Sequence, residues 1–291
     1  MAFRWRVAVL LLGASCSSGS NPPPAQPSPT PPPPKPSIDP VRVEPARDLA
    51  IRYPKAGAGI SRYAFSRRDS VIATMPSGDA QVQILGRTAF VTLTWVAADT
   101  GTRLTATVDS AVADSGFTGL APMLDSARGS RWTAVRRPGG RLTDLTGGPR
   151  SLIADQVRDQ LQLLFPLLPP DGAHPGATWS DSSTATARVS AFEATETALG
   201  ATRAESMVTA SGALPLLVVR TRSATAQGTQ FGQPMTLRAT GSDTLTYHIA
   251  PDGRVLVVEG VRLTDLVVDL PSSGQSVPAR ERSALRMILL R

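Results

Sequence analysis

The chain has one cysteine and two histidines, and this scarcity narrows the kinds of site that it can carry. A single cysteine excludes an internal disulfide and any cluster of cysteine ligands around a metal. The histidines, His174 and His248, share no spacing with each other or with a carboxylate that suggests metal binding. We therefore expect neither a bound metal nor a cofactor.

Lysine is also scarce, because only Lys35 and Lys55 are present and the other basic residues are arginines. The formal net charge is +7, yet the arginines are scattered, with doublets only at Arg67-Arg68 and Arg136-Arg137. Aromatic residues make up 5% of the chain, and no basic block is interleaved with them. The sequence therefore lacks the signature of a protein that binds nucleic acid.

Familiar catalytic patterns are missing as well. The sequence contains no H-E-x-x-H, calcium-binding loop, phosphate-binding glycine loop or G-x-S-x-G. We predict that the chain is not an enzyme. A hydrolase remains an alternative, because a serine nucleophile with a distant histidine leaves no local signature.

The N-terminus has the three parts of a secretory signal. Arg4 and Arg6 supply positive charge, residues 7–12 are apolar, and the small residues Gly13 and Ala14 follow. The apolar run is far shorter than the roughly 20 residues that a membrane-spanning helix needs. Residues 1–15 are therefore predicted to be a signal peptide.

The only cysteine comes directly after this segment. The stretch Gly13-Ala-Ser-Cys16 resembles the lipobox of bacterial lipoproteins, although that family prefers leucine where Gly13 stands. The resemblance implies that Cys16 becomes the first residue of the mature chain and carries acyl chains, such as palmitate, that hold it in a membrane. A group with two or three chains anchors a protein stably, whereas one chain holds only marginally.

The residue after the cysteine bears on location. Lipoproteins that stay in the inner membrane have an aspartate directly after the cysteine, and the same resemblance would place it at position 17. This chain has Ser17 there. We expect a lipid-anchored protein of the cell envelope, in the outer membrane facing the periplasm. The alternative is a secreted protein, because Gly13 and Ser15 also suit an ordinary secretory cut.

Proline dominates the next segment, including four consecutive prolines at 31–34. Such a tract favours extended polyproline II and cannot bury a core. Residues 22–36 alone could reach about 45 Å, at roughly 3.1 Å per residue. We therefore predict a disordered tether over residues 16–44 and a globular domain over 45–291. No protein partner is specified.

The globular region alternates between apolar and polar residues, as strands with one buried face do. Gly139-Gly140 and Asp252-Gly253 lie between such runs and predict hairpin turns. The patterns predict about ten antiparallel strands, which include residues 80–84, 90–96, 103–109, 132–136, 141–145, 214–226, 235–249, 262–270 and 284–290, and a hairpin over 247–258.

One segment has a helical pattern instead. Over residues 151–165 the apolar residues at 152, 153, 157, 161, 164 and 165 fall on one stripe. Pro149 and Ser151 suit a helix start, and Pro166 ends the helix. Asp155 and Asp159 are expected on its polar face.

These elements predict a mainly β fold, with one large curved antiparallel sheet, half-barrel-like, and one amphipathic helix packed on its concave face. The helix is followed by Phe165-Pro-Leu-Leu-Pro-Pro170 and by Pro175-Gly-Ala-Thr-Trp179. Over about residues 130–180 this order resembles a family of uncharacterised bacterial envelope proteins. It is more loosely similar to half-barrel lipoproteins and lipoprotein carriers, which hold acyl chains between a curved sheet and helices.

The helical stripe and the nearby tryptophan define a candidate ligand cavity. It would be lined by Leu152, Val157, Leu161, Leu164, Phe165 and Trp179, which could equally form an ordinary core. We predict a membrane-anchored, non-enzymatic envelope lipoprotein that binds an apolar or lipid ligand in this cavity. The alternative is a structural or interaction lipoprotein that presents a β surface to envelope partners.

Overall fold

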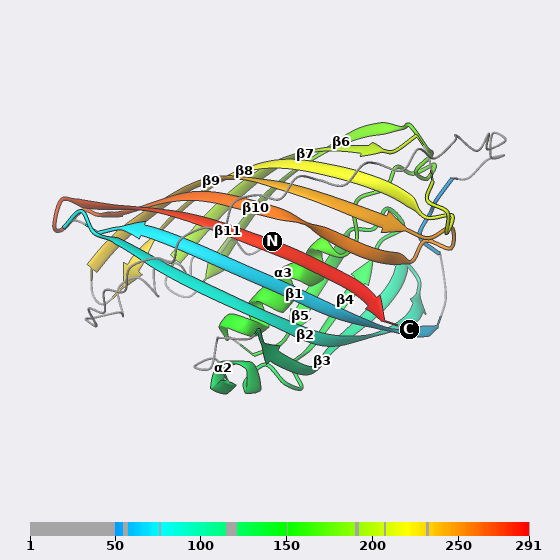
Figure 1. Ribbon diagram of the computed structural model, residues 1–291, viewed down its shortest axis with the longest axis horizontal. Coiled ribbons are helices and arrows are strands. Elements are labelled where there is room, and N and C mark those ends of the chain that lie inside the picture. The colour runs from blue at the N-terminus through cyan, green and yellow to red at the C-terminus, as the bar shows by residue number, and fades with distance from the viewer. Residues whose placement is uncertain are drawn as a thin grey trace, which may run out of the picture.

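One antiparallel sheet of eleven strands dominates the computed structural model (Figure 1). The structure describes residues 50–54, 58–75, 77–114, 121–149, 151–189, 192–206, 208–230 and 233–290. The predicted signal peptide, Cys16 and the tether lie outside these residues. The strands are β1 (Gly59–Thr74), β2 (Ala80–Ala98), β3 (Gly101–Ala113), β4 (Arg131–Arg136), β5 (Leu142–Gly147), β6 (Thr178–Val189), β7 (Phe192–Ala204), β8 (Leu214–Gln230), β9 (Gln233–Ile249), β10 (Val255–Leu270) and β11 (Gln275–Leu290).

Neighbouring strands of the sheet are also neighbours in sequence, except at one place. The order is β5-β4-β3-β2-β1-β11-β10-β9-β8-β7-β6. The first and last strands pair in the middle, with Tyr63 opposite Leu289 and Ala73 opposite Ala279. Two meanders of hairpins, one from each half of the chain, therefore join through β1 and β11, and the edges are β5 and β6.

In the described part of the chain two helices accompany the sheet, α2 (Ala121–Asp125) and α3 (Leu152–Leu163). Helix α3 lies on the concave face (Figure 1). Its N-cap is Ser151, whose hydroxyl accepts a hydrogen bond from the backbone N–H of Ala154. The predicted helix and the mainly β fold are thus confirmed. Neither described helix is long and apolar enough to cross a membrane.

The main core, in which α3 packs against the sheet, contains most of the apolar stripe of the helix. Val157, Leu161 and Leu164 are fully buried there, with Phe65 and Leu93 from the sheet. A second apolar group on the same face, the distal cluster, includes no described residue of either helix. It consists of Ala73, Phe192, Ala194, Ala224, Ala226, Met235, Leu237, Ala239, Leu266, Val268, Val277 and Ala279.

The two predicted hairpin turns are confirmed, but several strand boundaries are wrong. The predicted strands 80–84 and 90–96 are parts of the single strand β2, and no bounds were predicted for β1, β6 and β7. In β7 the side chains alternate perfectly between buried and exposed. The many alanines, glutamates and threonines of this strand hide the alternation, because alanine can be buried without marking an apolar face.

The expected polar face of α3 also needs correction. Asp159 is only 8% exposed, and Gln156 and Gln160 are buried too. The helix is buried around most of its circumference because the sheet beneath it carries polar groups that its polar side chains bind.

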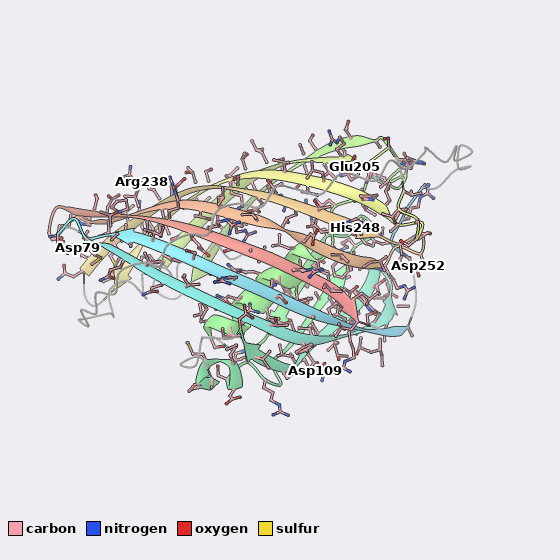
Figure 2. The ribbon with its side chains drawn as sticks, viewed as in Figure 1. Asp79, Asp109, Glu205, Arg238, His248 and Asp252 are labelled. Carbon is pink, nitrogen blue, oxygen red and sulfur yellow. The ribbon has the colours of Figure 1, made fainter. Side chains whose placement is uncertain are left out.

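The convex face of the sheet carries exposed charges, which pair across strands. Arg238 on β9 contacts Asp269 on β10 at 2.9 Å, and Arg280 on β11 contacts Asp265 at 2.7 Å. Arg238 is labelled in Figure 2, as is His248 on the same strand. Exposed pairs of this kind contribute little to stability, because water screens the two charges.

Candidate functional site

The C-terminal end of α3 is held by three aromatic side chains from distant parts of the chain. The Tyr247 hydroxyl donates to the carbonyl of Leu163, the Tyr53 hydroxyl to that of Pro166, and the Trp179 indole to that of Leu167, each at 2.8 Å. Carbonyls at a helix end lack partners within the helix, and Pro166 prevents its continuation. The three donors satisfy these groups and fix the position of Phe165 between them.

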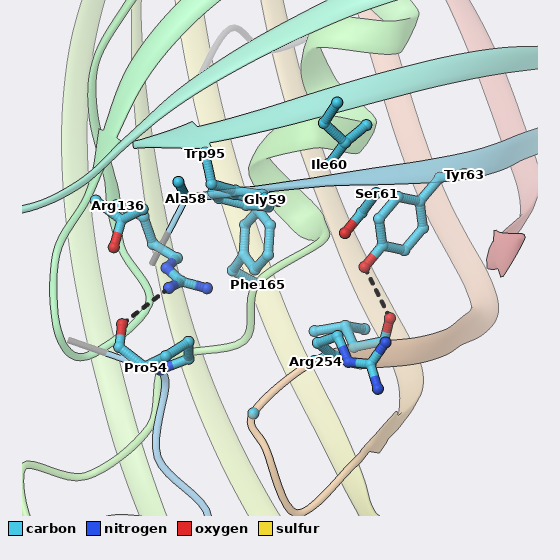
Figure 3. Close-up of a pocket in the computed structure, with 13 residues that line it drawn as sticks. Pro54, Ala58, Gly59, Ile60, Ser61, Tyr63, Trp95, Arg136, Phe165 and Arg254 are labelled. Atoms are coloured by element: carbon cyan, nitrogen blue, oxygen red, sulfur yellow. Dashed lines mark hydrogen bonds between the residues drawn. The ribbon is translucent and has the colours of Figure 1, made fainter. Parts of the chain in front are cut away.

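A pocket of about 240 Å³ opens beside Phe165, at one end of the concave face (Figure 3). Its walls come from the starts of β1, β3 and β10, from β2, from the end of β4, and from the segment that follows α3. They include the rings of Tyr63, Trp95 and Phe165, the charged Arg136 and Arg254, and the apolar Ile60. Ile60 is 73% exposed and stands at the rim, so the pocket has an apolar entrance.

Arg136 is the buried charge of this pocket. It is 6% exposed, and its guanidinium carbon lies 4.7 Å from the ring centroid of Tyr53, 5.0 Å from that of Trp95 and 5.5 Å from that of Phe165. It donates one hydrogen bond, 3.2 Å long, to the carbonyl of Pro54. Burial lowers the pKa of Arg136, but an arginine in a protein remains protonated.

Tyr63 closes the inner wall. Its hydroxyl donates a 2.9 Å hydrogen bond to the carbonyl of Val255, so the phenol is already used by the fold. Burial raises the pKa of Tyr63, which keeps the ring neutral. The wall therefore presents an aromatic face rather than an acid or a base.

A second polar feature crosses the middle of the concave face. Cross-strand partners place charged and polar residues in a transverse line, which we call the inner charged row. It consists of Asp181, Arg220, Asp243, Arg262, Ser283 and Asp69, with Gly200 between the first two. A Cβ at Gly200 would overlap the Asp181 carboxylate, so glycine leaves the space in which this side chain meets Arg220.

Acidic and basic groups alternate along this row. Arg262 makes two hydrogen bonds to the Asp243 carboxylate, of 2.9 and 3.1 Å, and Arg222 contacts the same carboxylate at 3.1 Å. Arg220 contacts Asp181 at 3.3 Å. Each of these buried charges therefore has a group of opposite charge beside it, as buried charges require.

The other end of the row joins α3. Arg67 binds Asp69 at 2.6 Å, and the side-chain amide of Gln156 donates to Asp69 at 3.1 Å. Arg87 donates to the side-chain carbonyls of Gln156 and Gln160, at 2.8 and 3.0 Å. These side chains fill the space between the sheet and the middle of the helix. The pocket described above lies beyond the C-terminal end of the helix.

Two buried acids near Arg222 have opposite pKa shifts. For Asp243, burial raises the pKa, but Arg262 and Arg222 outweigh that effect and the net shift is downward. For Glu196, whose carboxylate is 3.7 Å from Arg222, burial raises the pKa and the arginines do not compensate. Asp243 is therefore the stronger ion-pair partner of the two.

The six predicted cavity residues do not all meet at one site. Phe165 lines the pocket, Val157, Leu161 and Leu164 lie in the main core, and Trp179 packs against that core. Leu152 is partly exposed at the start of the helix.

The sequence interpretation missed Arg136, Tyr63 and Trp95. Their proximity depends on the successive pairing of β1, β2, β3 and β4, which no local pattern reveals. The scarcity of aromatic residues was one signal that could have pointed to some of these residues. The chain has only three tyrosines, and all of them belong to the main core.

No group of three His, Cys, Asp or Glu side chains in the described part of the chain is placed to hold a metal ion. His174 lies in the loop before β6, and His248 lies on β9. The structure does not bring them to the pocket lining described above.

Comparisons with known proteins identify no family. No protein-family model and no curated protein matches the chain. Among solved structures, the chain is similar to Neisserial surface protein A, with 11% sequence identity and a TM-score of 0.21. The match covers 80% of this chain and 99% of that one.

Proposed function

We propose that the protein is a lipid-anchored, non-enzymatic protein of the bacterial envelope that binds an apolar or lipid ligand at the end of its curved sheet. The observation that carries this proposal is the pocket of about 240 Å³ between Phe165 and the strands, with aromatic walls and the exposed Ile60 at its rim. Ligand sites combine apolar walls with a few fixed polar groups in the same way.

The size of the pocket suits one end of a ligand. Small-molecule sites usually measure about 300–1,000 Å³, so this pocket is slightly smaller than the usual range. A chain-like ligand would place one end among Tyr63, Trp95 and Phe165 and extend outward past Ile60.

The anchor rests on the sequence. The lipobox-like stretch before Cys16 and the proline-rich segment behind it support a domain tethered to a membrane through acyl chains. Metabolic labelling with radioactive palmitate should label the whole chain but not a Cys16→Ala variant. Label on both chains, or on neither, would contradict lipidation at Cys16.

Ligand binding is tested separately, by feeding cells a photoreactive fatty acid and mapping its adducts on the purified whole chain. Adducts are expected on peptides that contain Ile60, Trp95 or Phe165. The variant Ser61→Trp, which fills the pocket, should lose them. Ser180→Trp, which adds the same ring at an exposed position on β6, should keep them.

Adducts spread evenly over the surface, or unchanged by Ser61→Trp, would contradict a ligand site here. In that case, trapping of one defined protein neighbour by crosslinking in cells would favour the alternative of a structural or interaction lipoprotein.

A further inference from the structure

We propose that Arg136 is an anion-binding residue, and that the pocket takes an amphipathic ligand by its carboxylate or phosphate group. This inference rests on the proposed function, because it assigns the chemistry of the polar end of the ligand. It is carried by the burial of Arg136, by its lack of a described carboxylate partner and by its place in the pocket lining.

Arg136 differs from the other buried arginines of the sheet. Arg67 and Arg222 each contact an aspartate, and Arg87 binds two glutamine side chains. Within the described part of the chain, no carboxylate lies within 4.0 Å of the Arg136 guanidinium nitrogens, whose one hydrogen bond goes to the carbonyl of Pro54.

A buried charge without a counter-charge is strongly unfavourable in water-free surroundings. The rings of Tyr53, Trp95 and Phe165 offset part of that energy, since a cation near an aromatic face gains about 0.5–2 kcal/mol. These rings also hold the guanidinium at the pocket wall. A guanidinium has five N–H donors, so the Pro54 carbonyl leaves most of them for a ligand.

The rest of the pocket lining strengthens the preference for an anion. Among the described residues, the lining contains two arginines, Arg136 and Arg254, and no aspartate or glutamate. Arg254 stands at the rim and is paired with Asp252 at 2.6 Å, so its charge is compensated. The net positive charge of the lining therefore comes from Arg136 (Figure 3).

The shape of the group fits carboxylate and phosphate. The planar guanidinium fork can bind two oxygens of either group at once, and such charged hydrogen bonds are about twice as strong as neutral ones. The aromatic rings around it would contact the first carbons of an apolar chain. A fatty acid and a lipid phosphate satisfy the same geometry, and the experiment distinguishes them.

The test uses the whole chain in phosphatidylcholine nanodiscs and three photoreactive ligands with the same sixteen-carbon chain. These are palmitate, hexadecyl phosphate and the neutral hexadecanol. The amount of adduct on peptides containing Ile60, Trp95 or Phe165 is measured against ligand concentration. We expect at least one of the two anions to half-saturate the site at a concentration at least tenfold lower than hexadecanol. The better anion identifies the headgroup.

Arg136→Met keeps an unbranched apolar stem and removes the charge. Anion binding should fall about 10- to 100-fold, as expected for loss of a charged hydrogen-bonded pair worth about 1.5–3 kcal/mol, while hexadecanol binding should stay within threefold. Arg136→Lys should restore part of the anion preference. Arg238→Met, the control on the convex face of the sheet, should change the preference by less than threefold.

The outcomes separate the two proposals. If no ligand labels the pocket peptides, the proposed function is wrong. If all three label them equally, or if Arg136→Met leaves the preference unchanged, the pocket binds apolar chains but Arg136 is not an anion site. Should Arg136→Met fail to fold, the preference of the unmodified chain and the behaviour of Arg136→Lys still decide the question.

Discussion

The indole N–H of Trp179, at the start of β6, donates a 2.8 Å hydrogen bond to the carbonyl of Leu167, which follows α3. This contact joins the two halves of the sequence pattern that runs from Phe165-Pro-Leu to Trp179. The pattern therefore has a structural role, because it fixes the chain that leaves the helix. Phe165 reaches the pocket wall from this fixed segment.

Replacing Trp179 with phenylalanine should lower the free energy of unfolding by about 1–3 kcal/mol. The change keeps most of the ring but leaves the Leu167 carbonyl without its donor, and an unsatisfied buried polar group costs this much. Urea denaturation of the whole chain measures the effect. Thr186→Val removes an exposed hydroxyl pair with Thr195 and should change the unfolding free energy by less than about 0.5 kcal/mol. Equal effects of both variants would contradict the role given to Trp179.

Local patterns predicted the general fold, because residues such as those of 90–96 and the turn at Asp252-Gly253 encode their structure within a few positions. The curved sheet, the helix and two hairpins followed from these signals. Strand β1 was missed because Arg67, Arg68 and Asp69 interrupt its apolar pattern. Arg67 and Asp69 nevertheless face inward and pair with each other, and Arg67 also pairs with Glu281, 214 positions away.

The pocket was less predictable than the fold. Phe165 could be proposed from the helical stripe, since the stripe is local. Arg136 looked like one of many scattered arginines, and its burial among three rings results from strand pairing and from the path of residues 51–54. A single sequence contains no direct signal for such long-range contacts.

Neutralising the two buried acids near Arg222 should have very different effects on stability. Asp243→Asn should lower the unfolding free energy by about 3–5 kcal/mol at pH 7, because it leaves Arg262 and Arg222 without their shared counter-charge. Glu196→Gln should leave stability unchanged or raise it, because burial already disfavours the charged form of Glu196. Urea denaturation of both variants checks the contrast, and equal losses would contradict it.

The pH dependence of stability should separate the same two acids. The pKa of Asp243 is lowered in the folded chain, so its contribution is present above the unfolded pKa of about 3.9 and is lost as the pH falls through the folded value. The pKa of Glu196 is raised, so its contribution is present below about 4.3 and is lost as the pH rises through the folded value.

The stability of Asp243→Asn should therefore fall less steeply in acid than that of the unmodified chain. The difference between Glu196→Gln and the unmodified chain should shrink there. Denaturation curves from pH 3 to pH 7 measure both effects, and parallel profiles for all three chains would refute the assignment.

The contact between α3 and the sheet should behave as a coupled unit. Gln160 is fully buried and links Arg87 to the carbonyl of Ser66, at 3.0 and 3.1 Å. Gln160→Leu should lower the unfolding free energy by about 2–3 kcal/mol, since it removes a hydrogen bond to a charged group. Arg87→Met combined with Gln160→Leu should be less harmful than the sum of the single changes, by at least 0.5 kcal/mol. Additive losses would show that the two side chains act independently.

Gly260, in the middle of β10, should be the position of the sheet least tolerant of a methyl group. A Cβ there would overlap the carbonyl oxygen of Thr244 and approach the Cα of Leu245 to 2.9 Å, and both are backbone atoms of the paired strand. Because backbone cannot swing aside as a side chain can, β9 and β10 would have to separate at this point. We expect Gly260→Ala to lower the unfolding free energy by about 1–3 kcal/mol or more, the range for overpacking a well-packed interior.

Gly59→Ala provides the matched control, because nothing lies within 4 Å of a Cβ at that position. It should change stability by less than about 0.5 kcal/mol. If both variants melt alike, the close approach of the strands at Gly260 does not exist in solution.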